Sequence, residues 1–370
     1  MIGCRALRWL ARLLLVAAAL FVSAEIAARV YLHVKGYPAS RYIQVNHALR
    51  QARAASRDGF DTEYPYLPFR PAPGANPNLA ANGLGFLGEG ARWEPPERTL
   101  RVLCTGGSMV YYDAFPTVLE DCLDSLLAGE DTGYDSCQLL VSSGPTWSSM
   151  ECLVYYAVRG VYTRPHVVIV YVAVNDVYAM FVPDSIEVQP DYSHYRISMM
   201  PLPPVPWDLI PGWADSSRAV ALSRYALDRI MYPAYQKSPP PRLGLMYRFY
   251  PEYSIDTTFA TYRSNLEAMA AIAVSRGSSI FFVSELHDST RSSSPAMAHA
   301  VEALNDIAEA VARRHEAGGL VHFVDAASTI PADSSTLSDK SHLTEEGSEL
   351  IGRLVASEVC AGLRHHAEEP

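Results

Sequence analysis

Two segments far apart in the chain place polar groups where apolar segments end. Ser108 follows Gly106 and Gly107 directly after an apolar run, and paired glycines let the backbone turn tightly and present the serine hydroxyl and its N–H. Asn175 follows Val167–Ala173, where its side-chain amide could donate to a developing oxyanion. Taken singly, each has an ordinary structural explanation: a Gly-Gly-Ser turn for the first, an Asx turn at a strand end for the second.

A third segment supplies a base and a group that could orient it. Asp339 and His342 are three residues apart in a turn that precedes a predicted helix. The carboxylate could hold one ring nitrogen of His342 while the other faces outward as a general base. A solvated ion pair beside a helix is the alternative. Together, Ser108, His342, Asp339 and Asn175 form a complete set for nucleophilic acyl transfer, provided that the fold brings them together.

Short apolar segments alternate with helical patterns from residue 99 to residue 363. The predicted strands are 99–105, 138–142, 167–173, 279–284 and 320–325, and the predicted helices are 116–128, 147–160, 258–276, 296–315 and 345–363. This alternation predicts an α/β fold, a three-layer α/β/α sandwich around a parallel five-stranded sheet. Because carboxyl ends of parallel strands share one edge, the polar groups above are expected at that edge.

The segment of about 176–257 interrupts this alternation. It is rich in proline and tyrosine, contains Trp207 and Trp213, and far exceeds the usual ~2–6 residues of an α/β loop. We interpret it as an insertion after the third strand, with one helix at 215–232. It is either a surface excursion or a lid or wall over the site.

The first 34 residues have the layout of an export or anchoring segment. Arg5, Arg8 and Arg12 precede an apolar run that continues to Ala24. A signal peptide fits, with 22–24 as a cleavage site, and so does a spanning helix of about 20 residues. In both cases the basic flank stays in the cytoplasm and the rest is exported. We therefore divide the chain into an anchor or signal peptide (1–34), an extended lead-in (35–97) and a catalytic domain (98–366).

Composition excludes several classes of function. A formal net charge of −10 over 370 residues lacks the basic footprint of a nucleic-acid-binding protein. The 6 cysteines show no metal-ligand spacing, so buried thiols are expected, with a Cys122–Cys137 disulfide as the alternative. We expect neither a cofactor nor a metal.

The order of these residues, Ser early and Asp-x-x-His late, resembles the SGNH (GDSL-type) hydrolase family over roughly residues 82–363. Residues 106–108 are similar to its first block, with Gly107 where Asp is often found. Asn175 is similar to the third block, and Asp339 with His342 to the last. The resemblance implies a flavodoxin-like sheet with Ser108 as nucleophile, His342 as base and Asp339 as its partner.

Residues 142–149 resemble the family's second block, Asn-Ala-Gly-x-x-Gly-x-Thr/Ser-Ser. Gly144 matches the first glycine, whereas the second falls near Thr146 or Trp147. Gly144 and Thr146 are therefore rival backbone donors of an oxyanion hole that the resemblance also assigns to Asn175 and the N–H of Ser108.

Residues 82–86 are similar to an Asn-x-x-Gly-Phe segment of membrane-tethered bacterial members, which also begin with an apolar helix that carries a Glu, as Glu25 does here. This favours an uncleaved anchor with the catalytic domain in the periplasm or on the cell surface. The expected function is hydrolysis of an acyl or acetyl ester on a small molecule or glycan. O-acyl transfer to an envelope glycan and a non-catalytic envelope scaffold are the alternatives.

Overall fold

The computed structural model describes residues 2–34, 60–61, 66–67, 70–71, 82, 84–88, 92–129, 132–180, 189–192, 214, 217–231, 259–291, 295–315 and 318–368. The chain divides into two compact units. We name them the helical unit, Met1–Ser56 with Pro201–Tyr247, and the sheet unit, Arg57–Met200 with Arg248–Pro370.

The sheet unit is built on a parallel sheet of 5 strands in the order β4-β3-β5-β6-β7. The strands are β3 (Thr99–Gly106), β4 (Ser136–Ser143), β5 (Val167–Tyr171), β6 (Ser279–Val283) and β7 (Val321–Val324). This is the flavodoxin-like order, with a switch point where the chain moves from one side of β3 to the other. Gly106 is in register with Ser143 and Tyr171, so β3, β4 and β5 end at one level.

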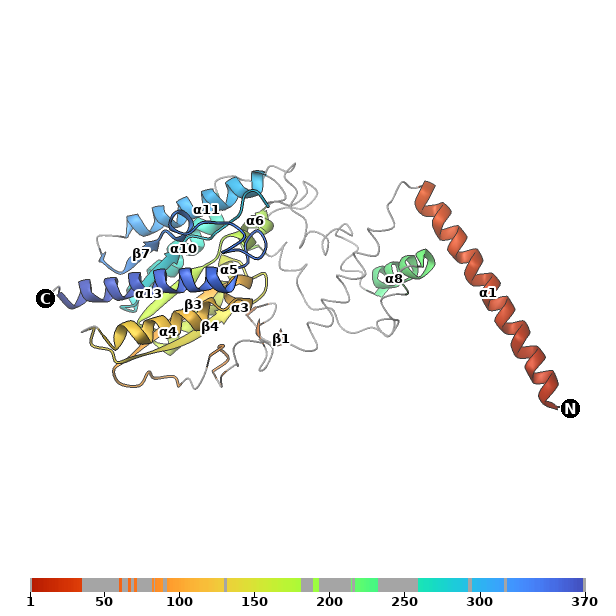
Figure 1. The fold of residues 1–370 in the computed structure, drawn as a ribbon, viewed down its shortest axis with the longest axis horizontal. Coiled ribbons are helices and arrows are strands. Elements are labelled where there is room, and N and C mark those ends of the chain that lie inside the picture. Colours follow the sequence, from red (N-terminus) through yellow and green to blue (C-terminus); the bar gives the residue numbers. More distant parts are fainter. Residues whose placement is uncertain are drawn as a thin grey trace. The chain divides into compact units, whose positions relative to one another are not determined.

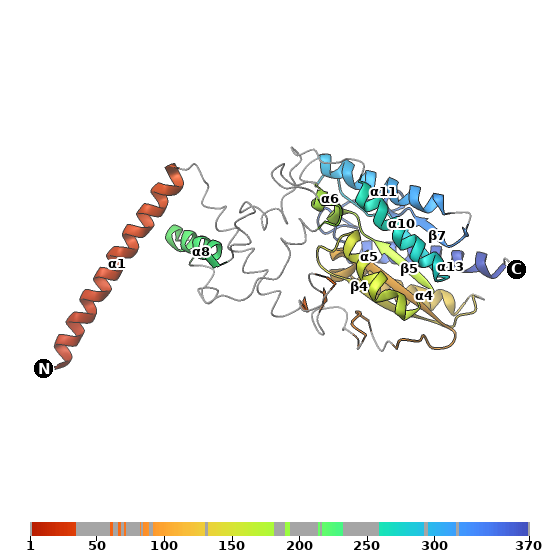
Figure 2. The same ribbon diagram turned by 180° about the vertical axis from the view of Figure 1, so that it is seen from behind.

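Helices cover both faces of this sheet (Figures 1 and 2). On one face lie α4 (Phe115–Leu127) and α13 (Glu345–Glu368), and on the other α5 (Ser149–Val158), α10 (Ala260–Ser275) and α11 (Pro295–Arg314). The predicted three-layer α/β/α sandwich is confirmed, and each of these elements lies within a few residues of its predicted range. The remaining elements of the sheet unit are a small antiparallel pair, β1 (Phe60–Asp61) with β2 (Arg70–Pro71), and the 3-10 helix η1 (Gly160–Thr163).

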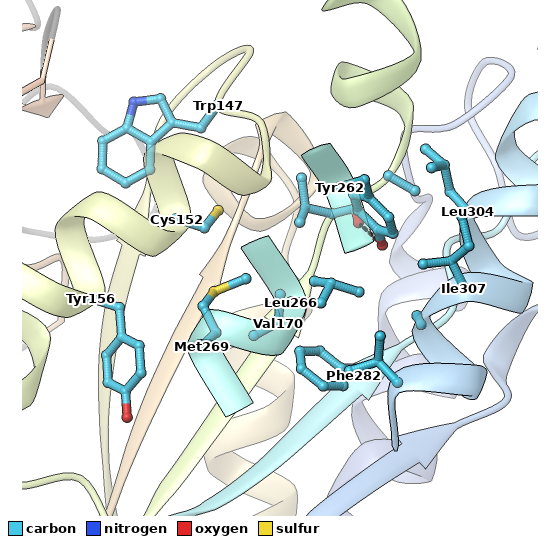
Figure 3. Close-up of a cluster of buried hydrophobic side chains, with 14 of the residues drawn as sticks. Trp147, Cys152, Tyr156, Val170, Tyr262, Leu266, Met269, Phe282, Leu304 and Ile307 are labelled. Atoms are coloured by element: carbon cyan, nitrogen blue, oxygen red, sulfur yellow. Dashed lines mark hydrogen bonds between the residues drawn. The ribbon is translucent and has the colours of Figure 1, made fainter. Parts of the chain in front are cut away.

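Strand β5 shows why the central strands are apolar throughout. Val168 and Val170 belong to the buried cluster under α5, α10 and α11, whereas Val167 and Ile169 belong to the cluster under α4 and α13. A strand covered on both faces needs apolar residues at consecutive positions. Figure 3 shows the first cluster, in which the Tyr262 hydroxyl donates to the Val172 carbonyl at 2.9 Å.

Three helices of the sheet unit were not predicted: α3 (Ser108–Tyr112), α6 (Val174–Met180) and α12 (Ala326–Thr329). Each has only 4 to 7 residues, too few to show a helical period in sequence. Two of them begin at or beside a candidate site residue.

The described part of the lead-in packs on the sheet unit. The Asn82 side-chain oxygen accepts from the N–H groups of Leu84 and Phe86, at 3.0 and 3.2 Å. Gly85 has a φ of 82°, which favours glycine, and Phe86 is buried. Leu87 forms a bridge to Val141 of β4. The Asn-x-x-Gly-Phe segment therefore makes a local turn that inserts an aromatic ring into the core.

The helical unit consists, in its described part, of α1 (Ile2–Val34) and α8 (Arg218–Met231), with Ala214 and Ser217 before it. Ala11–Val34 spans 24 residues and includes an 18-residue window of mean hydropathy 2.1, so by length and composition it could cross a membrane. The Glu25 carboxylate of α1 accepts hydrogen bonds from the Ser217 hydroxyl at 2.8 Å and the Ala219 N–H at 3.0 Å. The one glutamate of the apolar helix α1 is thus hydrogen-bonded to the residues at the start of α8.

Most of the predicted insertion, including Trp207 and Trp213, lies outside the described residues. Its predicted helix is α8. Tyr192, which belongs to the sheet unit, is buried in the core beneath α5 and α10. At that position the aromatic residue serves packing, while the lid or wall stays a prediction.

The predicted Cys122–Cys137 disulfide is wrong. Within the described residues, the cysteines are free thiols: Cys104, Cys122, Cys137, Cys152 and Cys360. The charged group that acts most on the Cys122 thiol is Arg353 of α13, whereas those around the Cys137 thiol are Glu120 and Asp124, with Cys360 also near. The two thiols therefore face different neighbours. The expectation of buried thiols holds for Cys104, Cys152 and Cys360.

Candidate active site

Ser108, His342 and Asp339 form one continuous hydrogen-bonded chain. The Ser108 Oγ lies 2.9 Å from His342 Nε2, and His342 Nδ1 lies 2.7 Å from an Asp339 carboxylate oxygen. Because a carboxylate only accepts, Nδ1 carries the hydrogen, and Nε2 of the neutral ring accepts from the serine hydroxyl. Residues 234 positions apart are thus placed as a hydroxyl, a base and a group that orients the base.

Close packing around two glycines places Ser108. Strand β3 ends at Gly106, and α3 begins at Ser108 with Gly107 as its N-cap residue. A Cβ at position 106 would lie 2.4 Å from the Tyr171 carbonyl oxygen, and one at position 107 would lie 2.4 Å from Asn175 Nδ2. Neither site admits a side chain without displacing its neighbours. The absence of a side chain at Gly107 lets the Asn175 amide approach the backbone beside Ser108.

The turn that carries His342 is held by Asp339. One Asp339 oxygen accepts from the N–H groups of Ser341 and His342, each at 2.8 Å, while the other contacts the His342 ring. Burial alone would raise the pKa of Asp339, but these hydrogen bonds outweigh it and leave the pKa below its usual value. Lys340 of the same turn donates to the Tyr178 hydroxyl at 2.5 Å and takes no part in the chain.

Asn175 lies in the first turn of α6, directly after the end of β5. Its side chain is buried, with the residue 5% exposed, and Nδ2 donates to the Trp147 carbonyl at 2.9 Å. An amide nitrogen has two hydrogens, so this bond fixes the side chain and leaves the second hydrogen for another acceptor. The structure therefore brings Asn175 together with Gly107 and Trp147 beside the turn that carries Ser108.

Thr146 has a backbone conformation that favours glycine. Its φ is 67°, in the left-handed region that favours glycine. Within the described residues its N–H has no hydrogen-bond partner. Gly144 is required for a different reason, since a Cβ there would lie 2.6 Å from the Trp147 indole nitrogen. Of the two rival donor positions, Thr146 therefore offers an unpaired backbone N–H among the described residues, whereas Gly144 makes room for the Trp147 ring.

Two buried carboxylates that are not among the predicted site residues support the segments next to Asn175. Glu285, just after β6, accepts from the N–H groups of Ala173 and Val174 at 2.6 and 2.9 Å. Asp176 accepts from the Ser149 N–H at 2.9 Å and from its hydroxyl at 2.5 Å. Ser148 is the N-cap residue of α5, and its neighbour Ser149 makes this contact with Asp176.

Burial dominates the electrostatics of both carboxylates. Loss of solvent raises the pKa of Asp176 to about 7, against hydrogen bonds from Ser149 that lower it. The same loss raises the pKa of Glu285 to about 8, against hydrogen bonds from the Val174 and Ala173 N–H groups. Groups this deep in the protein bind a proton more tightly than they do in water.

His287 and Asp288 follow β6 but do not contact each other through their side chains. His287 Nδ1 lies 3.3 Å from the hydroxyl of Ser341, the residue that precedes His342. Burial lowers the pKa of His287 to about 4. Asp288 instead pairs with Arg291, at 2.5 Å.

Among the residues that the structure describes, no group of three or more histidine, cysteine or acidic side chains is arranged to hold a metal ion.

No protein-family model and no curated protein sequence matches this chain. Solved structures similar to it include a lipase/acylhydrolase from Enterococcus faecalis, with 15% identity, 70% of this chain and 95% of that chain covered, and a TM-score of 0.42. A GDSL-like lipase from Bacteroides thetaiotaomicron has 11% identity, 72% and 90% coverage and a TM-score of 0.39. A catalytic mutant of an acetylxylan esterase from Geobacillus stearothermophilus has 11% identity, 70% and 93% coverage and a TM-score of 0.40.

Proposed function

We propose that this protein is a serine esterase of the SGNH type, which hydrolyses an acyl or acetyl ester through Ser108, His342 and Asp339. The observation that carries the proposal is the hydrogen-bonded chain from the Ser108 hydroxyl through both nitrogens of His342 to the Asp339 carboxylate. The motif resemblance of the sequence supports it independently.

In the acylation step, the Ser108 oxygen attacks the ester carbonyl carbon while His342 Nε2 takes the hydroxyl proton. Asp339 holds the ring and stabilises the imidazolium that forms. The tetrahedral intermediate then collapses, the bond to the leaving alcohol breaks, and His342 returns its proton to that alcohol. In the second step His342 takes a proton from water, whose oxygen attacks the acyl carbon. The bond to the Ser108 oxygen then breaks, the acid leaves, and His342 returns its proton to the Ser108 oxygen.

The negative oxygen of the intermediate needs hydrogen-bond donors, each worth ~2.7–4 kcal/mol of barrier. We assign this role to the Ser108 N–H, the free amide hydrogen of Asn175 and the Thr146 N–H. The choice of Thr146 over Gly144 is supported by its left-handed φ of 67° and by its unpaired N–H among the described residues. Asn175 is supported by its contact with the Trp147 carbonyl, which lies one residue beyond Thr146.

A fluorophosphonate probe tests the proposal directly, because it reacts with an activated serine and needs no known substrate. We expect the full-length protein in detergent to be labelled at Ser108, and Ser108→Ala to lose both labelling and hydrolysis of a short acyl ester while its melting temperature is unchanged. The matched control is Ser125→Ala, an exposed serine on α4. Equal labelling of wild type and Ser108→Ala, or no labelling of either, contradicts the esterase and favours the scaffold.

Location and substrate are further parts of the proposal. We infer that α1 remains as an anchor and that the sheet unit lies on the extracytoplasmic side, because arginines precede the apolar segment. The contact of Glu25 with α8 supports an uncleaved leader. Cleavage after Ala24 would make Glu25 the first residue of the chain and remove the helical turns of α1 that precede it. A 24-residue helix is about 36 Å long, enough for a hydrocarbon core of ~30 Å.

We propose an acylated small molecule or glycan as substrate and treat residues 98–366 as the catalytic domain with the insertion at about 176–257. An ester panel from acetyl to long acyl defines the acyl group. The same acyl-enzyme would serve O-acyl transfer, so each reaction is repeated with a glycan acceptor. Acylated acceptor instead of free acid would assign the protein to the transferases.

A further inference from the structure

Asp113 connects the segment that carries the nucleophile to the segment that carries the base. It is the C-cap residue of α3, the helix that begins at Ser108, and it is half-buried. Its carboxylate accepts a hydrogen bond from the Leu343 N–H at 2.8 Å. Leu343 follows His342, so this single bond joins the two short segments whose spacing sets the distance from the serine hydroxyl to the imidazole.

Apolar packing alone does not fix this relation. Leu343 shares a buried cluster with Met109, Val110 and Tyr111 of α3, which brings the segments together but leaves their register free to slide. A hydrogen bond to a charged acceptor has a narrow range of distance and angle. The Asp113 contact is therefore suited to hold the 2.9 Å approach of Ser108 to His342.

Asp113 also lies in the electric field of the site. The charged and titratable groups that face it are His342, Asp339 and Tyr171. Burial raises the pKa of Asp113 to about 6, with Asp339 adding to the rise while the Leu343 N–H and His342 oppose it. At neutral pH the carboxylate is ionised and favours the imidazolium that forms when Ser108 attacks.

We propose that Asp113 is a positioning residue, which ties the helix of the nucleophile to the backbone of the base and adds a second negative charge beside the imidazole. This inference rests on the proposed function. Sequence reasoning did not select Asp113, because its partner is 230 residues away and is a backbone group that leaves no pattern.

Two substitutions separate the tie from the charge. Asp113→Asn keeps an oxygen that can accept from the Leu343 N–H but has no charge, whereas Asp113→Ala removes both. Asp121→Asn, an exposed carboxylate on α4, is the matched control. All variants are made in the full-length protein, and we measure the rate of fluorophosphonate labelling of Ser108 against pH and the hydrogen exchange of the peptide that contains Leu343.

For Asp113→Ala we expect labelling to slow by up to about 100-fold, since a displacement of about 1 Å has that effect, and the Leu343 peptide to exchange faster. For Asp113→Asn we expect wild-type exchange and a modest loss of rate. The wild-type carboxylate takes up a proton at a pH of about 6 and then loses its charge, so the rate advantage of the wild type over Asp113→Asn should shrink as the pH falls below that value. Asp121→Asn should match the wild type in both measurements.

If Asp113→Ala is labelled and exchanges hydrogen at wild-type rates, the positioning role is overturned. If the pH profile of Asp113→Asn equals that of the wild type, the role of the negative charge is overturned. Should Asp113→Ala fail to fold, Asp113→Leu, which also removes the acceptor but keeps the side-chain volume, takes its place in both measurements. Absence of labelling in the wild type would instead overturn the proposed function, and hydrogen exchange would still show whether Asp113 holds the Leu343 N–H.

Discussion

The two sides of the candidate site are built in different ways. On the proton-transfer side, Asp339 and His342 lie in one turn, with side chains 55% and 36% exposed, and reach Ser108 through hydrogen bonds. On the proposed donor side, Asn175 is buried, and the buried carboxylates Glu285 and Asp176 accept from the N–H groups of Ala173 and Ser149. In the proposed mechanism the base takes a proton from water and the oxyanion donors keep a fixed position, and the partial exposure of His342 and the burial of Asn175 suit these two tasks.

The largest expected effect is on the proton-transfer side. His342→Gln removes the base but preserves much of the side-chain volume, so kcat/KM for a short acyl ester should fall by about 10⁴-fold, as when a catalytic triad is disabled. The measurement is initial-rate hydrolysis by the full-length protein. His299→Gln, an exposed histidine on α11, is the control and should keep full activity. Activity of His342→Gln within tenfold of the wild type would remove His342 from the mechanism.

A smaller loss is expected on the donor side. Asn175→Ala should lower kcat by about 10²–10³-fold with little change in KM, because an oxyanion donor acts in the transition state and little in the ground state. Steady-state kinetics on the same ester separates the two constants. Lys340→Ala is the comparison, since Lys340 contacts Tyr178 and lies outside the hydrogen-bonded chain. A loss confined to KM would show that Asn175 binds substrate and does not stabilise the oxyanion.

The smallest effect concerns stability, and its sign follows from the raised pKa of Glu285. The folded protein holds this proton up to a pH of about 8, whereas a free glutamate has a pKa of 4.5. Between these values the folded state binds more protons than the unfolded state, so this group lowers the free energy of unfolding as pH rises. Glu285→Gln lacks that contribution.

The test is thermal unfolding of the full-length wild type and Glu285→Gln at pH 5 and pH 8. The melting temperature of the wild type should fall from pH 5 to pH 8 by more than that of Glu285→Gln does. Glu302→Gln, an exposed glutamate on α11, should behave as the wild type. Equal pH dependence in the wild type and Glu285→Gln would show that Glu285 does not carry the buried proton.

Most of the fold could be predicted because the strands are apolar on both faces. The run from Val167 to Ala173 indicated a covered parallel strand, and β5 occupies its first part. The short helices α3 and α6 could not be predicted, since each is defined by where a neighbouring strand ends and not by a period. The alternative of a Cys122–Cys137 disulfide was wrong because the spacing of two cysteines in the sequence does not show where their side chains point.

The sequence by itself determined the alternation of strands and helices, the apolar leader, and the local Asp339–His342 turn, because each depends on residues that are close together in the chain. Only the tertiary structure decided that Ser108 lies 2.9 Å from His342 and that Asn175 lies against Gly107. It alone identified Asp113, Asp176 and Glu285 as supports of the site. Their contacts join distant segments and end mostly on backbone N–H groups, which every residue except proline carries, so no residue type in the sequence marks them.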